Sequence, residues 1–194
     1  VVPDVERVRA SEAFAAERYL RVGHRPEAPR IGYYFASPAG KRWAQRTATT
    51  LQQLGLPPPP LAAEAQYPLQ QTSCPALYVS LARVDSAAHE QRMHAPGALR
   101  AEAYGLFIAL AREFDDPPEW PIDSLDVRDA NARPAPGTPV TLGGTLVLES
   151  DALGRIRFAR SEPGPLEARL ARPGSRRVLL DSDRGVILTE RHGP

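Results

Sequence analysis

Apolar and polar positions follow two different patterns along the chain, and the change of pattern divides it into two parts. Up to about residue 114, segments with apolar residues at helical spacing alternate with short runs rich in β-forming residues. Helices are predicted over 5–17, 37–55 and 87–114, the last interrupted at Pro96-Gly97, and strands over 18–22, 30–37 and 75–84. This alternation favours an α/β layer built on a largely parallel sheet.

Three local signals support these predicted elements. Ser37 can cap the second helix, Pro38 suits its first turn, and Gly55 can end it. The four prolines of 57–60 cannot continue a helix and predict an extended connector. The almost unbroken apolar run over 75–84 is typical of a strand that is buried on both faces.

The pattern changes after residue 114. Residues 115–124 are rich in proline and have the character of a linker. Short alternating runs separated by glycine-containing turns follow over about 70 residues, which predicts a small all-β sandwich. We therefore predict an α/β domain over 1–114, a linker over 115–124 and a β-sandwich module over 125–190.

Composition narrows the function only a little. Hydrophobic residues make up 42% of the chain and charged residues 24%, which is ordinary for a globular protein. A net charge of +1 lacks the basic excess of a nucleic-acid-binding protein, so no nucleic-acid partner is expected. No apolar run approaches the roughly 20 residues of a membrane-spanning helix. Cys74 is the only cysteine, so no disulfide can form within the chain.

His24 is the most interesting candidate for chemistry, because it follows a predicted strand. It is either a strand-end histidine bonded to the backbone or a metal ligand whose partners lie outside this chain. His89 and His94 lie about 140° apart on a helix and do not form a chelating pair, and His192 lies in the terminal tail. Ser80 lacks the flanking glycines and the orienting aspartate of a serine nucleophile.

Several segments together resemble the zinc-dependent N-acetylmuramoyl-L-alanine amidases, which cleave the amide between glycan and stem peptide in peptidoglycan. In LRVGHRPEAPRIGYYF, His24 takes the place of a metal-binding histidine at a strand end, and a tyrosine-rich strand follows. GKRWAQRTATTLQQLG, PALYVSLARV and ALRAEAYGLFIALAREF resemble the family's next helix, a later strand and the final helix. The resemblance covers residues 6 to 114 and implies a mixed sheet flanked by helices, with an extracytoplasmic location.

Two departures from the family pattern bear on activity. Ser80 stands where the family has its catalytic glutamate, and the element that supplies the other two zinc ligands does not occur in this chain. Catalytic zinc needs about three protein ligands and an open position, and the reaction needs a carboxylate to move the proton. The resemblance therefore implies no catalytic residue in this chain as it stands, and zinc only if an upstream segment completes the site. We expect the chain to begin within the fold.

The second part resembles the carboxypeptidase-regulatory-like, or transthyretin-like, sandwich modules. DANARPAPGTPVTL and ESDALGRIRFA carry this resemblance. In the second segment, Asp151 is expected to cap a loop and Gly154 to take a left-handed conformation. A calcium site there would need more converging carboxylates than the segment offers.

Three functions follow as expectations. The first is a cell-envelope protein, an inactive or impaired amidase relative with a wall-binding, regulatory or scaffold role. The second is a structural envelope component with no saccharide site. The third is an active zinc amidase completed by an upstream segment, with Glu27 or Glu64 as the nearest carboxylates. The expected partners are peptidoglycan, envelope proteins or the chain's own missing segment, with no membrane span.

Overall fold

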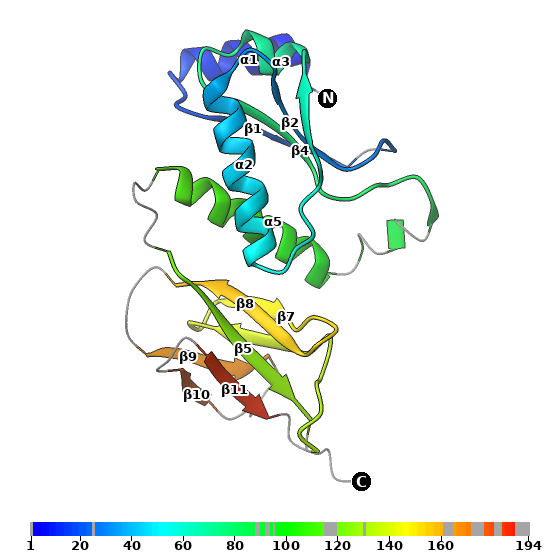
Figure 1. The fold of residues 1–194 in the computed structure, drawn as a ribbon, viewed down its shortest axis with the longest axis vertical. Coiled ribbons are helices and arrows are strands. Elements are labelled where there is room, and N and C mark those ends of the chain that lie inside the picture. The colour runs from blue at the N-terminus through cyan, green and yellow to red at the C-terminus, as the bar shows by residue number, and fades with distance from the viewer. Residues whose placement is uncertain are drawn as a thin grey trace. The chain divides into compact units, whose positions relative to one another are not determined.

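A computed structural model describes residues 2–24, 26–87, 90–91, 94, 96–114, 120–129, 131–160, 165–171, 177–180 and 184–188. The chain forms two compact units (Figure 1). The first unit comprises Val1–Gln52 and Pro57–His94, and the second comprises Gln53–Leu56 and Ala95–Pro194. The predicted α/β fold class, with a mixed sheet flanked by helices, is confirmed, and the rest of the chain adds two further sheets.

The first unit is built on a four-stranded mixed sheet with the order β1-β4-β2-β3. Its elements are α1 (Asp4–Ala13), β1 (Tyr19–Val22), β2 (Arg30–Tyr34), α2 (Pro38–Gln53), β3 (Leu61–Glu64), α3 (Tyr67–Gln71) and β4 (Ala76–Ser80). The pairs β1–β4 and β2–β3 are parallel, whereas β2 and β4 run antiparallel. The sheet is therefore mixed rather than largely parallel.

Strand β4 is the centre of this sheet, and all five of its residues are buried. Its apolar sequence predicted this burial correctly. Helix α2 passes close to the start of β4, since a Cβ built on Gly40 would lie 3.5 Å from the carbonyl oxygen of Ala76. The short helix α3 packs against β4 through a cluster of Leu69, Ala76 and Tyr78.

The predicted ends of α2 are confirmed. The Gly40 amide donates a hydrogen bond of 3.0 Å to the Ser37 hydroxyl oxygen, which leaves one fewer free amide at the start of the helix. Gly55 has a φ of +80°, the left-handed conformation that ends many helices. Strand β3 and helix α3 were not predicted, because the proline-rich connector and the short Leu-Ala-Ala-Glu run carry little signal of either.

The second unit contains helix α5 (Pro96–Phe114) and two β-sheets. Its strands are β5 (Ile122–Arg128), β6 (Pro139–Leu142), β7 (Leu146–Glu149), β8 (Arg155–Ala159), β9 (Leu166–Leu170), β10 (Arg177–Leu180) and β11 (Arg184–Leu188). One sheet has the order β10-β9-β6-β7 and the other β11-β5-β8. Residues of both sheets share one hydrophobic core, as in a β-sandwich.

Strand β5 begins at Ile122, within the stretch predicted as a linker, and α5 groups with the second unit. Residues 115–119 of that stretch lie outside the described part. The domain boundaries at 114 and 124, and the likeness to carboxypeptidase-regulatory modules, stay predictions. Over the described residues, no helix is both long and apolar enough to cross a membrane.

The loop before β8 matches its prediction. One carboxylate oxygen of Asp151 accepts hydrogen bonds of 2.9 Å from the amides of both Leu153 and Arg155. Gly154 has a φ of +69°. The described residues hold no cluster of three carboxylate, histidine or cysteine side chains at this loop or elsewhere.

Candidate functional site at the end of β1 and β4

The structure brings His24 and Ser80 to the same edge of the first unit's sheet. Val22 of β1 pairs with Val79 of β4 in parallel register, and the Gly23 amide donates to the Val79 carbonyl oxygen at 3.0 Å. The residues that follow in both strands therefore lie at one edge. His24 is half-buried there, and Ser80 is only 1% exposed.

The hydroxyl of Ser80 is engaged within the protein. Its Oγ donates a long hydrogen bond of 3.4 Å to the carbonyl oxygen of Ala82. A buried hydroxyl with this partner can position backbone, but it cannot exchange protons at neutral pH as a carboxylate does.

Tyr78 is a third side chain near this edge, and no local pattern in the sequence predicts its place there. The residue is 1% exposed, and its hydroxyl oxygen lies 3.7 Å from the place where a Cβ on Gly23 would stand. The guanidinium carbons of Arg21 and Arg30 lie 5.8 Å and 5.3 Å from the centre of its ring. Two cations therefore share one aromatic ring beside the edge.

Strand register explains this grouping. Tyr78 pairs with Arg21 on one side and with Gly32 on the other, and residues paired across strands point to the same face. Arg30 lies two positions before Gly32, so it shares that face. The sequence shows only one arginine in each of the short runs that form β1 and β2, and this does not reveal that β4 lies between the two strands.

Both arginines are held by carboxylates. Arg21 pairs with Asp4 at 3.0 Å, and Arg30 pairs with Oε1 of Glu64 at 2.5 Å. The other oxygen of Glu64 accepts a hydrogen bond from Gln66. Because both of its oxygens are engaged, Glu64 is not placed to act as the missing catalytic carboxylate. Glu27, the other carboxylate named for that role, is exposed in a loop.

The described residues do not fit a zinc site. Zinc in a catalytic centre takes about three nitrogen, sulfur or carboxylate ligands. The edge offers one imidazole, from His24, and one hydroxyl, from Ser80, and the described part of the chain has no group of three such ligands. The role of His24 as a metal ligand therefore stays a prediction that depends on residues other than those described.

Other aromatic, cysteine and histidine side chains lie away from this edge or outside the described residues. Phe35, which is 63% exposed, follows β2 and makes an edge-to-face contact with Tyr34 at 4.7 Å. Because β2 runs antiparallel to β4, this pair lies at the opposite edge.

Burial raises the pKa of the half-buried Cys74 thiol, as expected for an unreactive cysteine. His94 is exposed, and His89 and His192 lie outside the described residues.

This chain is similar to known proteins in its fold and not in its sequence. No protein family and no curated protein matches the chain by sequence. Among solved structures, the catalytic domain of CwlV, an N-acetylmuramoyl-L-alanine amidase from Bacillus (Paenibacillus) polymyxa var. colistinus, matches with a TM-score of 0.51 at 14% identity. The match covers 57% of this chain and 65% of that structure.

Two further amidases match in the same way. The N-acetylmuramoyl-L-alanine amidase of Clostridium difficile 630 has a TM-score of 0.50 at 13% identity, covering 57% of this chain and 64% of its own. AmiC2 of Nostoc punctiforme has a TM-score of 0.50 at 17% identity, covering 57% and 65%. This chain thus spans a little under two thirds of each of these structures. Over somewhat more than half of its length, it has the fold of N-acetylmuramoyl-L-alanine amidases.

Proposed function

We propose that this chain belongs to a cell-envelope protein that binds peptidoglycan through its amidase-like unit without hydrolysing it. One observation carries the proposal: at the edge where the resemblance puts a catalytic glutamate, Ser80 is buried and bonded to a backbone carbonyl. Loss of a general base costs about a hundred- to ten-thousand-fold in rate. The fold supports a cell-wall role, and an extracytoplasmic location is part of the same proposal.

Binding would use groups that remain at the edge. His24 can donate or accept hydrogen bonds, and Arg21 and Arg30 keep 17% and 22% of their side-chain surface exposed. Guanidinium groups suit the carboxylates of stem peptides. A regulatory or scaffold role follows if such binding localises other envelope proteins at the wall.

The test is co-sedimentation of the 194-residue chain with purified peptidoglycan sacculi, followed by assay of the supernatant for released muropeptides, with and without added zinc. We expect the protein to pellet with the sacculi and to release nothing. His24→Gln should weaken pelleting, whereas Arg42→Gln, an exposed arginine on α2, is the matched control and should not.

Two other outcomes favour the other functions. Release of muropeptides that depends on zinc and on His24 would contradict the proposal and favour an active amidase whose remaining ligands come from another segment. A protein that neither pellets nor releases muropeptides would favour a structural envelope component with no saccharide site.

A further inference from the structure

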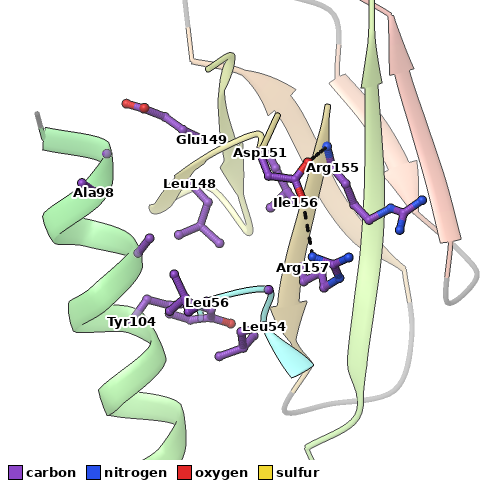
Figure 2. A pocket seen from close by; sticks show the side chains of 13 residues that line it. Leu54, Leu56, Ala98, Tyr104, Leu148, Glu149, Asp151, Arg155, Ile156 and Arg157 are labelled. Carbon is purple, nitrogen blue, oxygen red and sulfur yellow. Dashed lines mark hydrogen bonds and ion pairs between the residues drawn. The ribbon is translucent and has the colours of Figure 1, made fainter. Parts of the chain in front are cut away.

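The second unit contains a pocket of about 250 Å³ between α5, residues 54–56 and the strands β7 and β8 (Figure 2). Its wall is mainly aliphatic and comes from all of these elements. The aliphatic residues are Leu54, Leu56, Ala98, Ala101, Leu148 and Ile156. Tyr104 also lines the pocket, and burial raises the pKa of its phenol, in keeping with weakly polar surroundings.

Four charged side chains line this pocket, and one of them, Glu149, lies beside Gly97 of α5 and apart from the other three. Figure 2 shows Arg155 and Arg157 on β8, and Asp151 in the loop that precedes this strand. Arg157 forms an ion pair of 3.4 Å with Asp151. The guanidinium of Arg157 occupies the space that a Cβ on Gly55 would need, so this glycine leaves room for the arginine.

A second, polar groove of about 540 Å³ adjoins the pocket, because Arg155 and Arg157 line both. Arg112 is the third arginine of the groove. Among the described lining residues, the groove has one carboxylate, Asp123, which is buried and pairs with Arg160 at 2.6 Å. Arg112 donates hydrogen bonds to Oε1 of Gln53 and to the Trp120 carbonyl oxygen, so Arg155 and Arg157 are the two guanidinium groups that join the groove to the aliphatic pocket.

This combination selects a particular kind of ligand. Pockets for drug-sized molecules usually exceed about 300 Å³, so the aliphatic pocket admits only one or two small side chains. Guanidinium groups bind carboxylates through paired, charge-assisted hydrogen bonds, and partial burial strengthens them. Asp151 and Asp126 form ion pairs of 3.4 Å with Arg157 and 3.2 Å with Arg155, which hold the two arginines in place.

We infer that the second unit binds the end of a short peptide with small apolar side chains, with its terminal carboxylate on Arg155 and Arg157 and its side chains in the aliphatic pocket. The inference deepens the proposed function and rests on it for the source of the peptide. Stem peptides of peptidoglycan are rich in alanine and carry free carboxylates. The site would add a second contact with the wall, separate from the edge formed by β1 and β4.

The test is isothermal titration calorimetry of the 194-residue chain with N-acetyl-D-alanyl-D-alanine and with its C-terminal amide. We expect the acid to bind and the amide to bind at least about tenfold more weakly, because one charge-assisted interaction is lost. Arg157→Gln should weaken binding of the acid by at least about tenfold. Arg133→Gln, an exposed arginine of the same unit that lines neither cavity, should leave it unchanged.

A second pair of variants tests the aliphatic pocket without removing a charge. Ala98→Leu, on α5, fills the pocket and should weaken binding of the acid at least about tenfold, whereas Ala103→Leu, on the exposed side of the same helix, should not. Both substitutions keep a good helix former, so the fold should be retained.

Equal affinity for acid and amide, no saturation at millimolar acid, or equal effects of the test and control variants would each overturn the inference. The sacculus experiment separates it from the proposed function. Arginine-dependent binding of the peptide without pelleting on sacculi would support the site and contradict the peptidoglycan role. Pelleting on sacculi without peptide binding would support the role and overturn the site.

Discussion

The carboxylate of Glu64 lies over the backbone of Gly32, so that a Cβ built on this glycine would stand 2.9 Å from Oε2. The same carboxylate holds Arg30 and accepts a hydrogen bond from Gln66. Because the Arg30 and Glu64 side chains are only 22% and 15% exposed, their pairing is better shielded from water than a surface ion pair. Gly32 is therefore part of the arrangement that keeps Arg30 beside Tyr78.

Gly32→Ala should destabilise the first unit by about 1–3 kcal/mol, because the new methyl group pushes Glu64 away from Arg30. The measurement is the free energy of unfolding in urea. Glu64→Ala removes the obstacle, so adding Gly32→Ala to it should cost little, and the double-mutant cycle should show a coupling of about 1 kcal/mol or more. Full additivity would contradict the contact.

Tyr78→Leu should cost more than Tyr78→Phe. Leucine leaves part of the ring's volume empty and removes both arginine contacts, with an expected loss of about 2–4 kcal/mol in unfolding free energy. Phenylalanine keeps the ring beneath Arg21 and Arg30 and should lose about 1 kcal/mol. Urea unfolding of the two variants measures the difference. Equal losses of unfolding free energy would show that the contacts of the two arginines with the ring do not stabilise the fold.

Gly154→Ala should be far more damaging than Gly137→Ala. Both glycines have positive φ angles, +69° and +65°, so alanine carries a similar backbone cost of about 1 kcal/mol at each. At Gly154 the added Cβ would also meet the Val127 carbonyl oxygen at 2.6 Å, whereas nothing lies within 4 Å at Gly137. Thermal unfolding should show a loss of about 3 kcal/mol at position 154. Similar losses at the two positions would contradict the close packing of the loop on β5.

Asp126 should make the stability of the second unit depend on acid pH. Burial alone would raise the pKa of this carboxyl, but hydrogen bonds from Arg155 and Arg128 outweigh it and lower the pKa below the ordinary value of 3.8. The stabilisation is thus complete above pH 3.8 and is lost as the pH falls through the lower pKa of the folded state.

Unfolding free energy measured from neutral pH down to about pH 2 tests this linkage. Asp126→Asn should flatten the acid part of the profile, and Arg155→Gln should do so in part because it removes one hydrogen-bond donor. A profile for Asp126→Asn that keeps the original acid slope would show that other carboxyls carry the dependence.

The elements predicted correctly depend on signals within a few residues. The apolar run of β4, the Ser37 cap, and the Asp151–Gly154 turn each reflect the chemistry of a short segment. Strand β3 is different, because its four residues form a strand only by pairing with β2 at the edge of the sheet. Nothing local in Leu-Ala-Ala-Glu indicates that partner.

The candidate site also combines features that local sequence predicts with features that depend on strand pairing. The placement of His24 and Ser80 at one edge follows from two parallel strands that end together, which an α/β pattern already suggests. The grouping of Arg21, Tyr78 and Arg30 depends on the order β1-β4-β2 and on exact register, with partners more than 40 residues apart in sequence. The zinc role of His24 remains a prediction.

The division of the chain between its units has a consequence for how this protein can evolve. The chain leaves the first unit after Gln52, returns at Pro57 and leaves again after His94. The four residues of the excursion include Leu54 and Leu56, which line the pocket beside α5. An exchange of the β-rich part by recombination at a single junction would bring in a new pocket while keeping the old leucines. Substitutions at positions 54 and 56 should therefore be matched by changes on α5 and β8, whose residues line the same pocket.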